Sequence, residues 1–230
     1  MPSNLEILAY EMTELGLLCL RRRELLSEPG RFVTEVTLNH EFLMSSLFTD
    51  SERALARLAI RMHAGRDLRV LVGGLGLGYT AREALSSDRV ARVEVDELLP
   101  QVIDWFDRGL VPLASEFRRE PRLMITQCDV YRRLADLPLD RLDVILIDVD
   151  HSPDERLDEA SGMFYTRSGL RAAKRHLRED GVLGVWSYAE SSPFADALHS
   201  VFGEVRVEPI THHNHLVDER CTDWLFFVRG

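Results

Sequence analysis

Cysteine is scarce in this chain, and long apolar stretches are missing. Three of the 230 residues are cysteine, and Cys19, Cys128 and Cys221 stand far apart. An odd number of scattered cysteines forms neither a disulfide framework nor a closely spaced zinc site. No apolar run reaches about 18 residues, the length that a membrane-spanning helix needs. We therefore expect a cytoplasmic protein without a metal site and without a membrane partner.

Positive charge is also in short supply. The chain has 28 lysine and arginine residues against 38 aspartate and glutamate residues, a net charge of −10. Nucleic acids bind basic surfaces, so we expect no nucleic-acid partner. An acidic surface attracts cations, which favours a small cationic substrate such as an amine. Residues 1–12 carry acids and no basic segment ahead of an apolar core, so we expect no signal peptide.

Glycine, by contrast, is concentrated in one segment. Residues 69–78 read RVLVGGLGLG, an apolar run followed by Gly73, Gly74, Gly76 and Gly78. A helical pattern begins directly afterwards. A strand, a glycine turn and a helix in this order let the backbone approach a nucleotide, with the helix N-terminus toward the ligand. No Lys-Ser or Lys-Thr pair follows the glycines, so the segment is not a Walker phosphate loop.

Two acidic residues close the next apolar run. Glu94 and Asp96 stand at the end of the strand expected over residues 90–95. An acid at the end of the second strand is placed to bind the two hydroxyls of a ribose. With the glycine turn, this pair predicts a nucleoside-containing cofactor. A tight turn in another kind of α/β protein is the alternative.

Strands alternate with helices from about residue 68 onward, which predicts a doubly wound parallel sheet. The five strands expected there cover residues 69–73, 90–95, 122–126, 142–148 and 182–186. Two final strands, over residues 204–210 and 222–228, have no helix between them and must pair as an antiparallel hairpin. Such a hairpin is typical of class I methyltransferase-like, Rossmann-like folds. The predicted fold is therefore α/β, with a mostly parallel seven-stranded sheet.

The first part of the chain differs from the rest. We predict a small β-rich region over residues 1–48 and an α/β catalytic domain over residues 49–230. Two apolar segments, Phe32–Leu38 and Glu41–Ser46, flank Asn39 and His40, which suit a two-residue hairpin turn. An amphipathic helix is expected to begin near Ser51 and to end near residue 62.

A third group of polar residues follows the fourth expected strand of the large sheet. Asp148, Asp150 and His151 stand at the rim where such folds carry out chemistry. We regard them as candidates for orienting a substrate and removing a proton, and an imidazole titrates near neutral pH. The alternative is that they are turn and cap residues.

Histidines gather near the C-terminus. His212, His213 and His215 precede Asp218, and imidazoles with a carboxylate suit zinc or iron. Their spacing matches no known site, which favours a polar loop between two strands. Contact with a substrate is a third interpretation.

Five segments resemble the spermidine synthase family over roughly residues 68–190. They read VLVGGLGLGYTAREAL, RVEVDELLPQVIDW, TQCDVYRRL, LDVILIDVD and FYTRSGLRAAKRHLREDGVLGVW. The resemblance implies a nucleoside sulfonium cofactor in a cleft at the carboxyl ends of the strands. It also implies that Glu94 binds the ribose, that Asp129 receives the adenine amino group and that Asp148 borders the reacting centre. Tyr165 is placed to cover the cofactor or to contact the substrate, unless it only packs.

The chain departs from the aminopropyltransferases of that family at three motifs. Gly76 stands where they carry an aspartate that binds the amine of the cofactor. Their Asp-Ser-x-Asp-Pro signature reads DVDHSP over residues 148–153, with the second acid one residue early. Their Tyr-His-Glu or Tyr-Gln-Glu motif has the counterpart Thr49–Glu52, which lacks a tyrosine.

These motifs predict an S-adenosylmethionine-dependent transferase, with methyl transfer to a small molecule as the first interpretation. The alternative is an aminopropyltransferase that uses decarboxylated S-adenosylmethionine in polyamine biosynthesis. Cyclisation of the cofactor and a non-catalytic binding or assembly module stay open. The resemblance also implies a homodimer. The acceptor is not indicated by the sequence.

Overall fold

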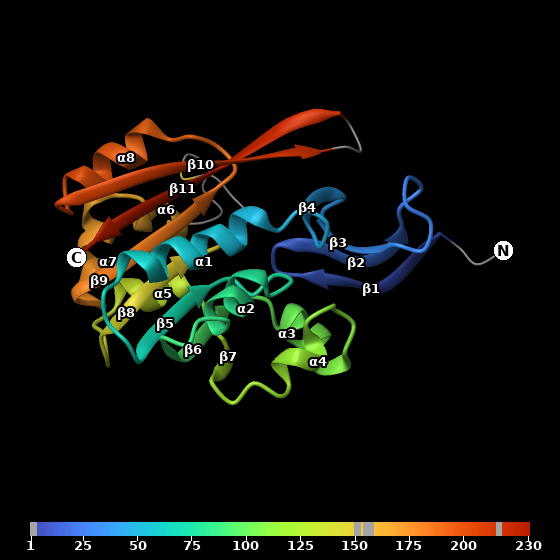
Figure 1. The fold of residues 1–230 in the computed structure, drawn as a ribbon, viewed down its shortest axis with the longest axis horizontal. Helices are drawn as coiled ribbons and strands as arrows, with labels where there is room; N and C mark the ends of the chain where they lie inside the picture. Colours follow the sequence, from blue (N-terminus) through green and yellow to red (C-terminus); the bar gives the residue numbers. More distant parts are fainter. Residues whose placement is uncertain (1–3, 150–152, 154–158, 215–217) are drawn as a thin grey trace.

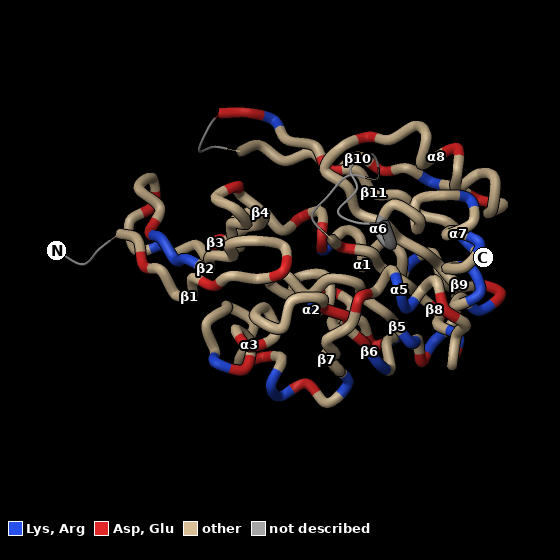
Figure 2. Tube along the Cα trace, turned by 180° about the vertical axis from the view of Figure 1, so that it is seen from behind, with Lys and Arg blue, Asp and Glu red and all other residues tan. Residues whose placement is uncertain are grey.

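The computed structural model describes residues 4–149, 153, 159–214 and 218–230. Figure 1 shows two parts along the long axis, a small sheet near the N-terminus and a larger sheet covered by helices. Acidic and basic residues are interspersed along both parts (Figure 2). No helix in the described ranges is long and apolar enough to cross a membrane.

The small sheet is antiparallel and has the strand order β1-β2-β3-β4. Its strands are β1 (Leu5–Thr13), β2 (Gly16–Glu24), β3 (Phe32–Leu38) and β4 (Glu41–Ser45). The predicted hairpin is confirmed, and Asn39 and His40 have φ values of 51° and 71°, as a two-residue hairpin turn requires. The sequence did not predict β1, because a bulge between Ile7 and Ala9 interrupts its period-two pattern.

The large sheet has the strand order β10-β11-β9-β8-β5-β6-β7. Its strands are β5 (Leu68–Gly73), β6 (Val90–Glu97), β7 (Leu123–Gln127), β8 (Leu142–Ile147), β9 (Leu177–Ser187), β10 (Glu204–Asn214) and β11 (Glu219–Arg229). Strands β5 to β9 pair in parallel, whereas β11 runs antiparallel to both β9 and β10. The predicted α/β fold, with seven strands and a terminal antiparallel hairpin, is confirmed.

Two strands end later than the sequence pattern indicated. Strand β6 continues through Asp96 and Glu97, which pair with Thr126 and Gln127 of β7. Strand β10 continues to Asn214, so His212 and His213 belong to a strand and not to a loop. In both places polar side chains end the apolar pattern before the backbone pairing ends.

Helices cover both faces of the large sheet (Figure 1). They are α1 (Asp50–Met62), α2 (Tyr79–Leu85), α3 (Pro100–Arg108), α4 (Ala114–Phe117), α5 (Val130–Ala135), α6 (Glu159–Phe164), α7 (Arg167–Arg175) and α8 (Ser192–His199). Successive side chains of a strand point to opposite faces. Val70 and Val72 of β5 therefore pack in one core with α1, α2 and α3, while Leu71 packs in a second core with α5, α7 and α8.

The connections of the large sheet determine where a ligand can bind. From β5 the chain builds β6 and β7 on one side, and then crosses to β8 on the other side. The carboxyl ends of β5 and β8 therefore border a topological switch point, the usual ligand site in open parallel sheets. Gly74 and Asp148 directly follow these two strands.

Candidate active site

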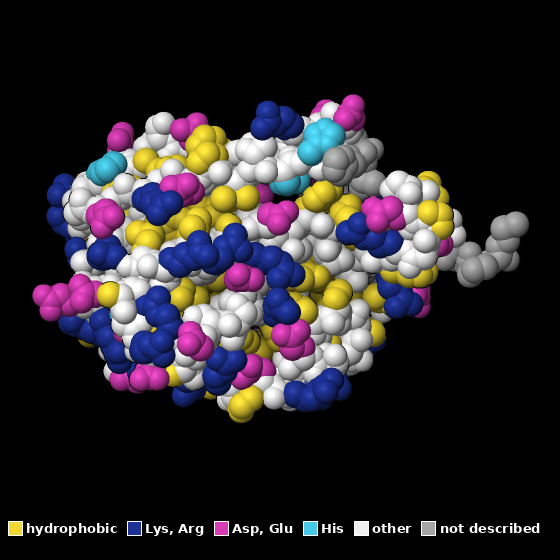
Figure 3. Space-filling model, in the orientation of Figure 1, with side chains coloured by type: hydrophobic (Ala, Val, Ile, Leu, Met, Phe, Trp, Pro, Cys, Tyr) yellow, Lys and Arg dark blue, Asp and Glu magenta, His cyan; other side chains and the backbone are white. Residues whose placement is uncertain are grey.

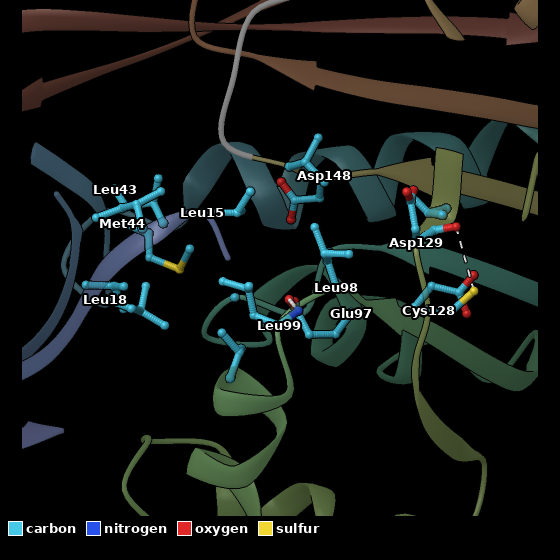
Figure 4. A pocket seen from close by; sticks show the side chains of 18 of the residues that line it. Leu15, Leu18, Leu43, Met44, Glu97, Leu98, Leu99, Cys128, Asp129 and Asp148 are labelled. Atoms are coloured by element: carbon cyan, nitrogen blue, oxygen red, sulfur yellow. Dashed lines mark hydrogen bonds between the residues drawn. The ribbon is translucent and has the colours of Figure 1, made fainter. Parts of the chain in front are cut away.

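An elongated pocket of about 1080 Å³, measured out to its open mouth, lies at this switch point. Figure 4 shows Cys128 and Asp129 on one side, Glu97 and Leu98 in the middle with Asp148 above them, and aliphatic side chains on the other side. We call Asp96, Glu97, Cys128 and Asp129 the polar end of the pocket. The apolar end consists of Leu15, Leu18, Val36, Leu38, Leu43 and Met44, all from the N-terminal part of the chain.

The glycine turn lies against this pocket at Gly74 and Gly76. Gly74 has a φ of +96°, and a Cβ atom there would lie 2.1 Å from the carbonyl oxygen of Asp148. Only glycine fits such a position. Gly73 and Gly78 do not line the pocket, because they pack against Val130 and Phe117 respectively. The predicted glycine loop is thus divided between two residues at the pocket and two that permit close packing behind it.

Glu97 ends β6 and lines the pocket, although the sequence analysis did not select it. Its two carboxylate oxygens accept hydrogen bonds of 2.8 Å from the backbone N–H groups of Leu75 and Leu99. Burial raises the pKa of Glu97, although these backbone hydrogen bonds act to lower it. The side chain connects the glycine turn to the start of α3 at the strand end where a ribose-binding acid is expected.

The position of Glu94 differs from the one expected from the sequence. It was expected to close the strand, but it lies three residues before the end of β6 and is not among the residues that line the pocket. Arg133 Nη2 donates to Glu94 Oε2 at 2.8 Å, and Arg92 and Arg69 lie within 3.5 Å. Burial would raise the pKa of Glu94, but these arginines lower it below its ordinary value. Glu94 neutralises an arginine cluster beside the sheet.

The other two acids predicted to bind the cofactor do reach the polar end. Asp96 accepts hydrogen bonds of 2.9 and 3.1 Å from Arg133 Nη1, and burial raises its pKa in spite of that charge. Asp129 caps α5, with Oδ1 accepting from the N–H groups of Tyr131 and Arg132. Both carboxylates are therefore held in place by neighbours within the protein while they line the pocket.

A second cavity, which we call the acidic cavity, adjoins the pocket. Its volume is about 410 Å³, and it meets the pocket at Met44, Gly76 and Asp148. Its other lining residues are Ser45, Glu52, Leu75, Leu77, Gly78, Tyr79 and Trp186. The hydroxyl group of Thr80 donates a hydrogen bond to Asp148 Oδ2. Asp148, a predicted catalytic residue, thus lies at the junction of the two spaces.

Three carboxyl groups interact at this junction, and two of them were not selected from the sequence. Burial, followed by the charge of Asp148, raises the pKa of Glu52 to about 8. Burial also raises the pKa of Asp148 to about 6, and Asp223 of β11 adds to both effects. Among the ion pairs of the described residues, none includes Glu52, Asp148 or Asp223. Buried charges are normally paired, so this group favours a cationic ligand.

The remaining candidates are Asp150, His151, Tyr165 and the C-terminal histidines. Asp150, His151 and His215 fall outside the described residues. Tyr165 does not line either space: its hydroxyl lies 3.0 Å from that of Tyr131, within an aromatic cluster. The ring of His212 stacks on Phe48, with 4.8 Å between ring centres, and His213 Nε2 lies 3.1 Å from Asp218 Oδ1.

About half of the chain is similar in sequence to part of a known protein. No family model matches the chain. It is 32% identical over 123 residues to Polyamine aminopropyltransferase 2 of Streptomyces coelicolor. That stretch covers 53% of this chain and 22% of the relative, so the chain spans only about a fifth of the length of the curated protein that it matches.

Solved structures extend the likeness to almost the whole chain. Spermidine synthase from Thermotoga maritima gives a TM-score of 0.75, and a spermidine synthase in complex with the transition state analogue AdoDATO gives 0.73. Each is 18% identical, and each comparison covers 97% of this chain and 72% of the other. A probable spermidine synthase from Corynebacterium glutamicum gives 0.67 at 17% identity. The chain therefore has a spermidine synthase-like fold, and about half of it is similar in sequence to part of a polyamine aminopropyltransferase.

Proposed function

We propose that this chain forms the transferase core of an aminopropyltransferase-type enzyme, the activity that the sequence analysis placed second. The donor is decarboxylated S-adenosylmethionine, with its nucleoside in the polar end and its ammonium group in the acidic cavity. The observation that carries the proposal is the pair of half-buried carboxyls Glu52 and Asp148, which line the acidic cavity and have no ion pair among the described residues. Asp223, also half-buried, helps to raise the pKa of both. The partial homology to an aminopropyltransferase supports the same activity.

The polar end fits the nucleoside of such a donor. Asp129 Oδ2 can accept a further hydrogen bond, which suits the amino group of adenine. Arg132 Nε lies 3.2 Å from this oxygen. Asp96 and Glu97 are placed for the ribose hydroxyls, and this role passes from Glu94 to Glu97. Gly74 lies so close to the carbonyl oxygen of Asp148 that a Cβ atom would clash with it, so glycine lets the turn pack against the end of β8 at the edge of the pocket.

The acidic cavity discriminates between the two forms of the donor. S-adenosylmethionine carries a carboxylate on its tail, whereas the decarboxylated form carries only the ammonium group. Placing a carboxylate beside Glu52 and Asp148, whose pKa values the nearby Asp223 also raises, would cost several kcal/mol, because like charges repel strongly when they are poorly solvated. Carboxyls from α1 and β11 thus supply the charge that is absent at Gly76.

The residues at the junction then have separate tasks. The bound sulfonium supplies a neutral thioether leaving group, so that the C–S bond breaks, with its electron pair on sulfur, while an amine nitrogen forms the new C–N bond. Asp148, with a pKa of about 6, is ionised at neutral pH and accepts the proton that the amine loses. Glu52, with a pKa of about 8, ionises when a cation binds beside it.

Methyl transfer is the second candidate, and Gly76 is the observation that favours it. A glycine there provides no carboxylate for a donor amine, as the sequence analysis noted. The acidic cavity opposes this reading, because the tail of S-adenosylmethionine would bring its carboxylate toward Glu52.

Turnover tests the proposal. The purified chain is incubated with decarboxylated S-adenosylmethionine or with S-adenosylmethionine, together with a mixture of primary amines, and the thioether nucleoside is measured. We expect methylthioadenosine from the decarboxylated donor, with a rate at least tenfold lower in Glu52→Gln. The matched control is Asp50→Asn, an exposed acid in the same helical turn. S-adenosylhomocysteine from the carboxylated donor alone would overturn the proposal in favour of methyl transfer.

A further inference from the structure

The apolar end of the pocket has a composition that the proposed donor does not require. Leu15, Leu18, Leu43 and Met44 lie together on the side away from Asp129 (Figure 4). Val36 and Leu38 of β3 complete this end, and Leu99, Val102 and Trp105 line the same pocket from the α3 region. The pocket is therefore a hydrocarbon surface on one side of Asp148 and a polar surface on the other.

A charged group is poorly accommodated at the apolar end. No charged side chain stands among its six residues or among the three that line the pocket from the α3 region. The polar atom that Trp105 brings is its indole nitrogen, a donor that is buried without a hydrogen-bond partner among the described residues. An ammonium group is also only a donor, so the indole nitrogen of Trp105 provides no hydrogen bond for it. Burying an ammonium group there would leave its charge unpaired.

This contrast separates the two reactants. A cationic tail belongs in the acidic cavity, beside Glu52 and Asp148. The apolar end, which reaches that cavity at Met44, then remains for the acceptor. An acceptor amine that reaches Asp148 from this side extends the rest of its structure among leucine side chains.

We infer that the apolar end binds an uncharged hydrocarbon group of the acceptor, so that the preferred acceptor is a monoamine with an alkyl chain and not a diamine. This inference rests on the proposed function. The amine nitrogen loses its proton to Asp148 and forms the C–N bond as the donor's C–S bond breaks toward sulfur. A second ammonium group at the far end of a diamine would lie beside Leu18 and Leu43 with no acceptor.

The test compares two acceptors of equal length, with the whole protein as the enzyme. With decarboxylated S-adenosylmethionine as donor, 1-aminohexane and 1,6-diaminohexane are assayed by release of methylthioadenosine. We expect kcat/KM to be at least tenfold higher for the monoamine, and to rise roughly fourfold per methylene from 1-aminobutane to 1-aminohexane until the apolar end is filled. A diamine that reacts as well as the monoamine would overturn the inference.

A binding measurement separates this inference from the proposed function. Calorimetry with methylthioadenosine present measures the affinity for the same monoamines without turnover. If no amine reacts but affinity still rises with chain length and falls for the diamine, only the proposed function fails. If transfer occurs and neither affinity nor rate depends on the length of the alkyl chain of the amine, only the inference fails.

A substitution in the apolar end tests the assignment to these residues. Leu43, a partly buried residue at the pocket wall, is changed to Glu to supply a carboxylate for a distal ammonium group. Leu43→Glu should reverse the preference toward 1,6-diaminohexane by at least tenfold, whereas the matched neutral variant Leu43→Gln should not reverse it. Should Leu43→Glu not fold, Leu38→Ala should weaken the dependence on chain length. An unchanged ratio in Leu43→Glu or, in its place, an unchanged chain-length dependence in Leu38→Ala would contradict the inference.

Discussion

The hydroxyl of Thr80 in α2 donates a hydrogen bond to the carboxylate of Asp148, which follows β8. The same hydroxyl lies 3.2 Å from the carbonyl oxygen of Glu52 in α1. Thr80 is almost fully buried, so one side chain connects the helix after the glycine turn, the helix that carries Glu52 and the proposed base. This contact stabilises the ionised form of Asp148, because it lowers a pKa that burial raises.

Removing the Thr80 hydroxyl should therefore shift the pH profile. Thr80→Val keeps the shape of the side chain but loses the hydrogen bond, so the pKa of Asp148 should rise above its value of about 6. Because the base must be ionised, the acidic limb of kcat/KM should move to higher pH by on the order of one unit. Thr80→Ser, which keeps a hydroxyl, should restore the limb. A uniform fall in rate with no shift of the limb would count against Asp148 as the base.

Glu52 should make stability depend on pH in a defined direction. Its pKa is about 8 in the folded chain, against an ordinary value of 4.5. The folded state therefore holds an extra proton between these values, so stability falls as the pH rises from about 4.5 to about 8 and does not fall further above that. Glu52→Gln should thus stabilise the ligand-free protein at pH 9. Because Glu52 is only partly buried, we expect a gain of ~2 kcal/mol there and little effect near pH 4.5. Urea denaturation at the two pH values measures this, and equal effects at both would contradict the assignment.

The two glutamates of β6 should separate binding from stability. Glu97→Gln should weaken the binding of methylthioadenosine by about tenfold, because a ribose contact and the tie to the glycine turn are both altered. Glu94→Gln should leave affinity within about threefold and lower stability by ~1–3 kcal/mol, because Arg133 loses a charged partner. Calorimetry and urea denaturation measure the two effects. The reverse order of affinities would restore Glu94 as the ribose ligand.

The outer face of the N-terminal sheet suggests how copies of the chain associate. Ile7, Tyr10 and Met12 of β1 are 59%, 55% and 73% exposed. Hydrophobic side chains appear at the surface of this region, at the right of Figure 3. We propose that this face forms the homodimer contact, since exposed apolar patches commonly mark interfaces. Light scattering should give a dimer, and Ile7→Glu with Met12→Glu should give a monomer, whereas Leu139→Glu should remain dimeric. A wild-type monomer would refute the proposal.

The parts of the fold that depend on local pattern could be predicted from the sequence. Alternating strands and helices, the glycine turn and the Asn39-His40 turn are local signals, and the structure contains all of them. Strand β1 and the end of β6 could not be predicted, because a bulge and buried acids break the apolar pattern on which such predictions rely.

The candidate site was harder to predict from the sequence, because its residues come from distant segments of the chain. Glu52 lies in the first turn of a helix, where an acid is ordinarily explained by the helix dipole. Asp223 precedes the apolar part of β11 and resembles any strand residue at a rim. Only the tertiary fold brings these two carboxyls to Asp148, where burial raises the pKa of both and the charge of Asp148 raises that of Glu52 further. The departure at Gly76 was visible in the sequence, but the compensation that we propose from α1 and β11 was not.

Binding of the two donor forms tests the central claim most directly. Calorimetry at pH 7.5 would compare decarboxylated S-adenosylmethionine with S-adenosylmethionine, in the wild type and in Glu52→Gln. The account predicts at least tenfold tighter binding of the decarboxylated form, with release of protons as Glu52 ionises, and a loss of most of this preference in Glu52→Gln. Equal or tighter binding of S-adenosylmethionine to the wild type would contradict it.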